Sequence, residues 1–182
     1  MTTPKVEQTT LPDLPALNDI PEEAIAPLPA VPTPAPLTLF GTSDPVVVIA
    51  QATRTAKALA DVIAKRNLYV MIQKRAYVTV EGWTLLGSML GVFPQIEWCR
   101  KLDNGWEARA LAVVAATGRV VGSGEAQCLR DERTWKDRDD YALRGMAQTR
   151  AISRALRGPL DFVVKLAGYH TTPAEEMPTD AG

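Results

Sequence analysis

Residues 95–129 read QIEWCRKLDNGWEARALAVVAATGRVVGSGEAQCL and contain three long β-rich runs. Two short stretches separate the runs: Asp103-Asn104, which precedes a glycine, and Thr117-Gly118. Both are typical of the tight turns that join neighbouring antiparallel strands. The segment therefore predicts a three-stranded antiparallel meander with strands over 95–102, 105–116 and 119–129.

A helix and a hairpin are expected before the meander. Asp44-Pro45 is typical of a helix start, with aspartate as the N-cap and proline at the first helical position. Two short β-rich runs follow, and their spacing favours a hairpin. The predicted elements are a helix from 44 to about 66, strands over 68–72 and 77–80 joined through 73–76, and a short helix over 82–90.

A long helix is expected after the meander. A charged loop, 130–138, leads to a helical pattern over 139–157, which Gly158-Pro159 is expected to end. A short helix to residue 166 closes the domain. The predicted fold class is therefore α+β, an antiparallel sheet (hairpin plus three-stranded meander) packed against a long C-terminal helix.

Composition divides the chain into three parts. Ten of the fourteen prolines lie in residues 1–45, and proline disfavours both helix and central strand. Residues 1–43 carry a formal charge of −4, residues 44–170 a charge of +6, and residues 171–182 a charge of −3. We predict a disordered, proline-rich acidic arm over 1–43, a basic domain over 44–170 and a disordered acidic tail over 171–182.

The sequence lacks the motifs of several classes of protein. No apolar run reaches the roughly 18 residues of a membrane span, and the first residues do not resemble a signal peptide. Cys99 and Cys128 form neither a disulfide framework nor a paired zinc motif, so a cytoplasmic protein with reduced thiols is expected. The only histidine, His170, lies at the edge of the predicted tail, where we expect a solvated surface residue, so no Ser-His-Asp or Cys-His arrangement is expected. There is no phosphate-binding G-x-x-x-x-G-K-[ST] loop. We expect neither an enzyme nor a cofactor.

One enzymatic alternative stays open. Glu97, Glu107 and Glu125 lie on the three predicted strands of the meander, where they could converge on a divalent metal as in a nuclease. Glutamates on half-exposed strands are more often cross-strand partners of basic residues, here Arg100, Arg109 and Arg119.

The basic residues predict a surface for nucleic acid. Arg150, Arg154 and Arg157 fall within about 60° of one another on the long helix, and such a row can follow a phosphate backbone. Tyr141, Ile152, Ala155 and Leu156 group on the opposite side, which is expected to pack on the sheet. The competing interpretation of the arginines is a solvated helix face. Further candidate contacts are Lys74 and Arg75 at the hairpin, Arg100 and Lys101 near a strand end, and the tryptophans Trp83, Trp98, Trp106 and Trp135, which either stack on bases or belong to the core.

Two segments resemble a known family. Residues 77–91 (YVTVEGWTLLGSMLG) resemble the strand-then-helix entry of Rad-fifty-two-like single-strand annealing proteins, and residues 147–157 (AQTRAISRALR) resemble their long helix, which closes with an R-A-L-R run. The body from about 68 to 168, meander included, looks like the phage and prophage recombinases of that group. The resemblance implies an ATP-independent protein that binds single-stranded DNA and anneals complementary strands in recombination and repair.

The resemblance also implies partners. Such proteins form homo-oligomeric rings or filaments with DNA in a basic groove, and a phage-encoded member acts in the bacterial host cytoplasm. The acidic arms are expected to compete for that groove or to contact host or phage replication and recombination proteins. Three rival functions stay open: a DNA-end-protecting protein of the same fold, the metal-dependent nuclease, and a scaffolding oligomer that uses the arginines for subunit contacts.

Overall fold

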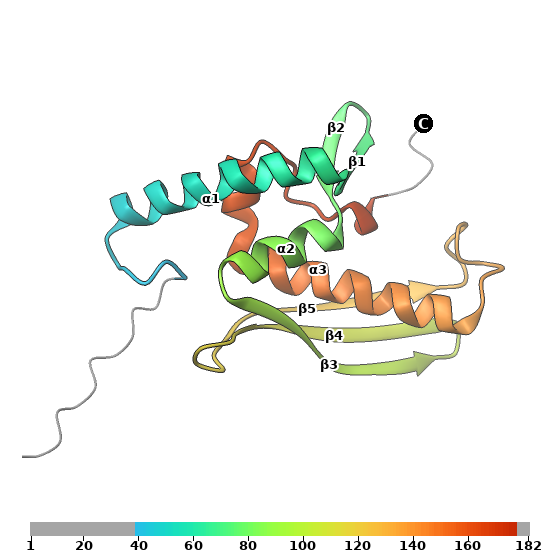
Figure 1. The fold of residues 1–182 in the computed structure, drawn as a ribbon. Helices are drawn as coiled ribbons and strands as arrows, with labels where there is room; N and C mark the ends of the chain where they lie inside the picture. Colours follow the sequence, from blue (N-terminus) through green and yellow to red (C-terminus); the bar gives the residue numbers. More distant parts are fainter. Residues whose placement is uncertain (1–38, 178–182) are drawn as a thin grey trace, which may run out of the picture. The chain divides into compact units, whose positions relative to one another are not determined.

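The structure is a computed structural model that describes residues 39–177, all of which belong to one compact unit, Ala35–Gly182. Predictions for residues 1–38 and 178–182 lie outside the described residues. The elements follow in the order α1 (Pro45–Arg66), β1 (Tyr69–Ile72), β2 (Arg75–Val78), α2 (Val80–Met89), β3 (Val92–Leu102), β4 (Gly105–Val114), β5 (Val120–Leu129), α3 (Asp140–Leu166) and the 3₁₀ helix η3 (Ala174–Glu176) (Figure 1).

The predicted α+β class is confirmed. β1 and β2 form an antiparallel hairpin, and β3, β4 and β5 form an antiparallel meander in that order. The hairpin is tighter than predicted, because Ile72 pairs directly with Arg75. Gln73 and Lys74 have φ angles of 48° and 61°, and positive φ at both central residues is the geometry of a two-residue hairpin turn.

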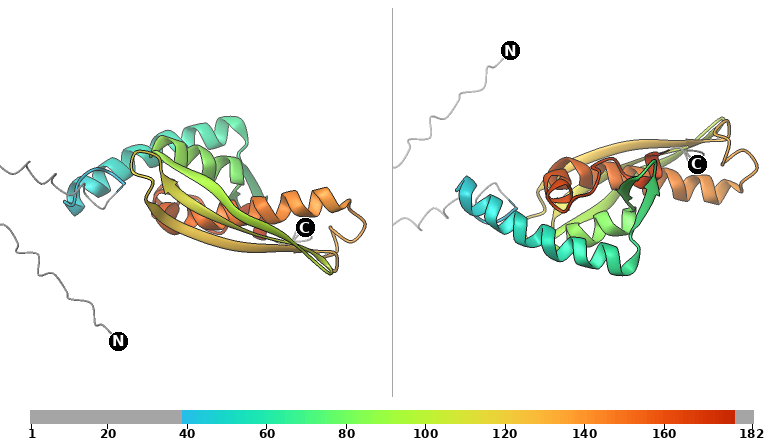
Figure 2. Two further views of the ribbon diagram at one scale, coloured as in Figure 1. Left: turned by 90° about the horizontal axis from the view of Figure 1, so that it is seen from below. Right: turned by 90° about the horizontal axis from the view of Figure 1, so that it is seen from above.

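Helix α3 packs directly on one face of the meander, and α1 and α2 lie on the same side of the sheet (Figures 1 and 2). The contact between helix and sheet is made of small side chains: Ala108, Ala110 and Ala112 of β4 and Ala151 and Ala155 of α3 are fully buried. Small side chains let a helix approach a strand closely. Among the described residues, no helix covers the other face of the meander (Figure 1).

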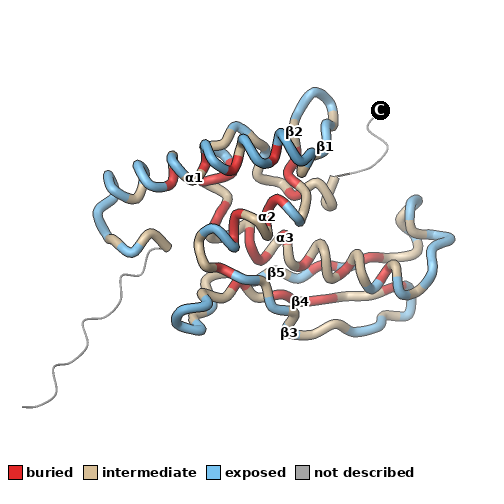
Figure 3. The backbone as a smooth tube through the Cα atoms, viewed as in Figure 1, coloured by how far each residue is buried: buried red, intermediate tan, exposed pale blue. Residues whose placement is uncertain are grey.

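The hydrophobic core lies between the three helices and the sheet (Figure 3). Leu59 and Ile63 of α1 and Trp83 and Leu86 of α2 are fully buried there. Trp83 therefore belongs to the core, which was one of the two interpretations that the sequence left open. The N-terminal cap of α1 is as predicted, since the Asp44 carboxylate accepts a hydrogen bond from Val46 N at 2.8 Å.

Two glycines of β5 set the distance between the strand and α3. A Cβ atom at Gly124 would overlap the Cβ atom of Arg154, and one at Gly122 would overlap the carbonyl oxygen of Ala155. Glycine at both positions therefore admits the helix backbone against the strand. The stem of Arg154 starts directly over β5 as a result.

Helix α3 is longer than the sequence predicts. The expected stop at Gly158-Pro159 is wrong, because Pro159 lies inside one continuous helix. Proline lacks the N–H for one helical hydrogen bond and crowds a carbonyl, so it bends a helix. Burial on both sides of the proline outweighs this cost, since Leu156, Leu160 and Val163 are fully buried. The last turns of α3 accordingly turn away from the sheet toward α1 (Figure 1).

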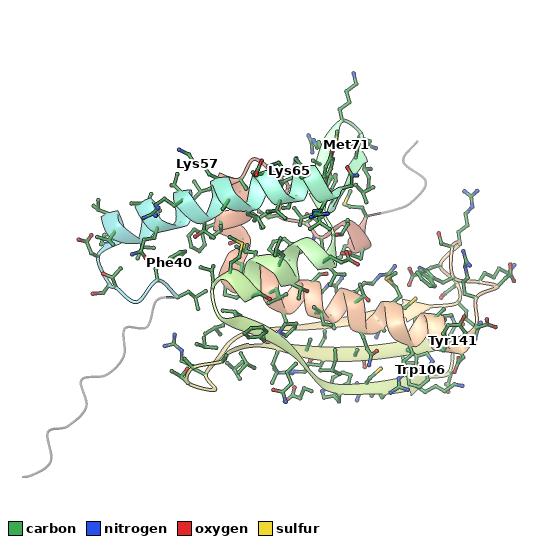
Figure 4. The ribbon with its side chains drawn as sticks, viewed as in Figure 1. Phe40, Lys57, Lys65, Met71, Trp106 and Tyr141 are labelled. Atoms are coloured by element: carbon green, nitrogen blue, oxygen red, sulfur yellow. The ribbon has the colours of Figure 1, made fainter. Side chains whose placement is uncertain are left out.

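Tyr141 does not pack on the sheet as predicted. Ala155 and Leu156 are fully buried, whereas Tyr141, at the start of α3 (Figure 4), is 77% exposed. The buried positions 143, 147, 151 and 155 are four residues apart, and such a row drifts by about 40° per step around a helix. In the first turn, the side of α3 that faces the sheet is therefore opposite Tyr141.

Residues 169–177, here called the C-terminal segment, pack on the folded body. The amide of His170 donates to the carbonyl of Ala76 at 3.0 Å, and the exposed His170 ring stacks on Tyr77 with 5.0 Å between ring centroids. Pro173 is fully buried. The predicted tail thus begins inside an ordered stretch, because residues 171–177 make packing contacts that their composition does not reveal.

Candidate nucleic-acid interface

The guanidinium of Arg150 is held inside the protein. It donates to both carboxylate oxygens of Glu132, at 2.8 and 2.6 Å, and to the carbonyls of Gln127 and Glu175, at 2.8 and 3.1 Å. Only 16% of its side chain is exposed. Arg150 therefore has its donors directed at protein acceptors rather than at solvent.

Ionisation of the pair agrees with this geometry. Burial opposes the charge on Glu132, but hydrogen bonds from Arg150 and from the Leu129 amide outweigh it and lower the Glu132 pKa. Hydrogen bonding to Glu132 raises the pKa of Arg150. Burial, with the nearby Glu132 charge, raises the pKa of the Cys128 thiol to about 11. Cys128 is therefore a neutral core residue at pH 7 and not a nucleophile.

Arg154 and Arg157 share one carboxylate of the C-terminal segment. Arg154 Nε donates to Glu176 Oε1 at 2.8 Å, and Arg157 Nη1 lies 3.6 Å from Glu176 Oε2. The arginine side chains are 40% and 41% exposed, whereas that of Glu176 is 14% exposed. The face formed by Arg154 and Arg157, here called the arginine face, therefore reaches solvent beside a carboxylate that already contacts it.

Two of these arginines also close an edge of the sheet. β5 is an edge strand of the meander, and an edge strand leaves peptide groups without a strand partner. Arg150 Nη1 donates to the carbonyl of Gln127, and Arg154 Nη1 donates to the carbonyl of Glu125 at 2.7 Å. The pair therefore satisfies alternate carbonyls of β5, and this links α3 to the strand.

Glu175 anchors the C-terminal segment at the start of α2. Its Oε1 accepts from Val80 N at 2.6 Å, and its Oε2 accepts from Ser153 Oγ at 3.3 Å. Thr79, the N-cap of α2, makes no side-chain capping bond, so Glu175 supplies the acceptor from a distant part of the chain. Burial raises the pKa of Glu175 above its ordinary value.

Arg100 and Lys101 near the end of β3 are both paired. Arg100 lies 2.6 Å from Glu107 and its guanidinium stacks over the Trp98 ring at 4.6 Å, while Lys101 contacts Asp140 at 3.0 Å. Lys101 therefore ties β3 to the start of α3. Both side chains are more than half exposed, so they reach solvent with a carboxylate beside them.

The carboxylates considered for a metal site have basic partners. Arg109 contacts both Glu97 and Glu125, at 2.7 and 2.8 Å, and Glu107 pairs with Arg100. Hydrogen bonds from Gln127 and Arg100 lower the Glu107 pKa. Within residues 39–177, no group of three or more His, Cys, Asp or Glu side chains is arranged to hold a metal ion. These glutamates therefore pair with basic residues, as the second interpretation of the sequence predicts.

A second group of basic residues lies on α1 and on the β1–β2 hairpin. Lys74 and Arg75, predicted from the sequence, are exposed at the β1–β2 hairpin, and Arg54, Lys57 and Arg66 are exposed on α1. None of the five makes an ion pair within the described part of the chain. Lys57 projects from the side of α1 turned away from α2, and the 57% exposed Met71 lies on the hairpin (Figure 4). At 100° per residue, Arg66 lies about 180° around α1 from Lys57, so these residues do not all share one side of the helix. The five residues are here called the α1–hairpin surface.

The spacing of residues along α1 indicates which of its cations face solvent. At about 100° per residue, Arg54 and Lys57 lie on the side opposite the buried Ala52, Ala56, Leu59 and Ile63. From sequence alone, this pattern predicts an amphipathic helix and no particular function for its polar side. These cations are candidates for DNA contacts because no carboxylate of the described residues pairs with them. The sequence cannot show this.

Comparison with known proteins gave no match: no family model matches the chain, and no curated protein or solved structure shows significant similarity to it. None of the helices formed by residues 39–177 is long and apolar enough to cross a bilayer.

Proposed function

We propose that this protein binds single-stranded DNA without ATP and anneals complementary strands, as the family resemblance implies. The observation that carries the proposal is the α1–hairpin surface. Five exposed cations without carboxylate partners in the described chain can each replace a counterion of a phosphate backbone. Met71 and Val70, 57% and 45% exposed on the same hairpin, offer apolar contact beside the cations.

The chemistry of annealing suits such a surface. Complementary strands repel each other through their phosphates, and annealing requires neutralised phosphates with base edges left free. Lysine and arginine side chains supply the first condition and read no sequence. The proposed activity needs neither a metal nor a catalytic residue.

Self-association belongs to the same proposal. A single copy offers only a short and discontinuous basic surface, because Arg54 and Arg66 are about 18 Å apart along the axis of α1 and about 120° apart around it. Copies arranged side by side would extend it into a continuous track for one strand. We therefore propose a homo-oligomeric ring or filament as the annealing form.

The test is an annealing assay in EDTA without ATP, with two complementary oligonucleotides that carry a fluorescence donor and acceptor. We expect the wild-type protein to accelerate annealing. The double variant Arg54→Glu/Lys57→Glu should lose most of this acceleration, since it reverses two charges of the α1–hairpin surface. The matched control is Lys136→Glu/Arg138→Glu, which reverses two exposed charges in the loop after β5 and should anneal like wild type.

Other outcomes separate the rival functions. Cleavage of the oligonucleotide on addition of Mg²⁺ or Mn²⁺ would favour the nuclease. Tight binding with protection from an exonuclease, but no faster annealing, would favour the end-protecting protein. An oligomer that binds no DNA would favour the scaffold.

A further inference from the structure

The carboxylate of Glu176 lies where the arginine face would hold a phosphate. We infer that the C-terminal segment competes with single-stranded DNA for Arg154 and Arg157, so that the segment must leave before DNA occupies this face. The inference rests on the proposed function and adds an autoinhibitory contact to it. It also separates two basic surfaces, since within residues 39–177 the cations of the α1–hairpin surface make no ion pair, whereas the arginine face contacts Glu176.

The contacts of Glu176 have the chemistry of a phosphate site. One carboxylate faces two guanidinium groups, with 2.8 Å from Arg154 Nε to Oε1 and 3.6 Å from Arg157 Nη1 to Oε2. Carboxylate and phosphate are both anions that accept charge-assisted hydrogen bonds from arginine. A phosphate at these donors would lie beside the Glu176 carboxylate, and the two like charges would repel each other. DNA and Glu176 therefore compete for the arginine face.

The contacts of the C-terminal segment allow it to leave the folded body as a unit. Its anchors lie at separate points: the buried Pro173, the Glu175 contacts with Val80, Ser153 and Arg150, the His170 contacts with β2, and the ring contact of Tyr169 with Tyr69. Gly168, with a φ of 87°, lies between α3 and the segment, at a backbone position that glycine adopts without strain. The segment can therefore detach at this residue without unwinding α3.

The burial of Glu175 makes detachment easier near neutral pH. Its raised pKa means that burial disfavours the charged form in the docked segment, and release to solvent relieves this cost. Glu176 provides the contact with the arginines, while Glu175 and Pro173 hold the segment in place. Removing the Glu176 charge, or loosening the anchors, should therefore weaken the competition between the segment and DNA.

The first experiment measures affinity for a fluorescein-labelled oligothymidylate with the full-length protein. Glu176→Gln keeps the shape of the side chain and removes its charge, so it should bind at least about fivefold more tightly than wild type, the lower end of ordinary couplings between sites. The matched control is Asp103→Asn, which removes one charge from the exposed β3–β4 turn. Asp103 makes no ion pair among residues 39–177, so this variant should bind like wild type.

A second variant leaves every charge in place. Pro173→Ala removes part of a buried ring and loosens the segment while Glu176, Arg154 and Arg157 remain. It should also raise the affinity. In an Arg154→Ala/Arg157→Ala background, both gains should disappear, because the released face no longer holds phosphates.

Hydrogen exchange reports on the segment itself. Addition of oligothymidylate should speed exchange of the amides of His170, Glu176 and Met177, which are hydrogen-bonded in the docked segment. If wild type binds DNA, but Glu176→Gln and Pro173→Ala bind no better and these amides keep their protection, the segment is a fixed part of the fold and the inference is wrong. If wild type and all variants fail to bind DNA, the proposed function falls and the inference falls with it.

Discussion

Arg150 of α3 donates to both carboxylate oxygens of Glu132, at 2.8 and 2.6 Å, and this bidentate pair joins the long helix to the loop that follows β5. The same guanidinium reaches the carbonyl of Gln127 on β5 and that of Glu175 in the C-terminal segment. Four parts of the fold therefore meet at one side chain. The geometry favours a structural role for Arg150 and leaves phosphate contacts to other cations.

Replacement of Arg150 should lower stability more than DNA affinity. We expect Arg150→Ala to reduce the free energy of unfolding by about 2 kcal/mol, since Glu132 and the two carbonyls lose their donor. Urea unfolding measures this. Arg150→Lys should recover only part of the loss, because an ammonium cannot match the bidentate geometry. An Arg150→Ala variant with wild-type stability and weakened DNA binding would contradict this structural role and indicate that Arg150 contacts DNA.

The same pair should make stability depend on acid pH. The Glu132 pKa is lowered in the folded protein, so its contribution is complete above the ordinary glutamate pKa of about 4.3 and is lost as the pH falls through the lowered value. The groups that face Glu132 are Arg150 and Cys128. The difference in urea midpoint between wild type and Glu132→Gln should therefore shrink below about pH 4. A difference that stays constant from pH 7 to acid would contradict the assigned pKa shift.

Local signals were sufficient for most of the fold. Asp44-Pro45 begins α1 as the sequence predicts, and the turns at 103–104 and 117–118 place the three strands of the meander. Each of these signals acts within a few residues. The end of α3 depends instead on distant packing, because burial of Leu160 and Val163 carries the helix through Pro159. The Gly158-Pro159 pair alone therefore does not indicate where the helix ends.

The candidate site was less accessible from sequence. A helical projection places Arg150, Arg154 and Arg157 together, but it cannot show their partners, which lie 18 and 22 residues away along the chain for the first two arginines. Charge and proline content predict that Glu175 and Glu176 belong to a disordered tail. The structure brings them to the arginines because Pro173 and Glu175 have buried positions on the body.

Two glycine substitutions should have opposite effects on stability. Gly124→Ala puts a methyl group against the Arg154 Cβ and the backbone of Ala155, so it should destabilise the protein by about 2 kcal/mol. Gly145→Ala, also inside α3, is the matched control, since a Cβ there meets no described atom within 4 Å and alanine favours a helix by about 0.5–1 kcal/mol. Thermal unfolding should show a lower midpoint for the first variant and an unchanged or higher one for the second. A Gly124→Ala protein as stable as wild type would contradict the close contact of α3 and β5.

Light scattering should show a homo-oligomer. Val46, Ile49 and Val120 are 75%, 53% and 51% exposed, and Val120 lines an apolar cavity of about 470 Å³ together with Phe40 and Phe162. Such apolar surface is expected to be covered by another copy. Ile49→Asp should shift the population toward monomers. A 19.8 kDa monomer at all concentrations, with and without DNA, would contradict the ring or filament.

The central claim is that cations of the α1–hairpin surface hold DNA phosphates, and the salt dependence of single-strand affinity tests it most directly. The dissociation constant for oligothymidylate would be measured between about 50 and 200 mM salt for wild type, Lys74→Ala/Arg75→Ala and the matched pair Arg100→Ala/Lys101→Ala. We expect the hairpin variant to lower the salt slope by roughly 1.4, two contacts at roughly 0.7 each, with equal losses for different base sequences. The matched pair should change little, because Glu107 and Asp140 already partner its cations. No binding by wild type, or a hairpin variant with the wild-type slope, would contradict the claim.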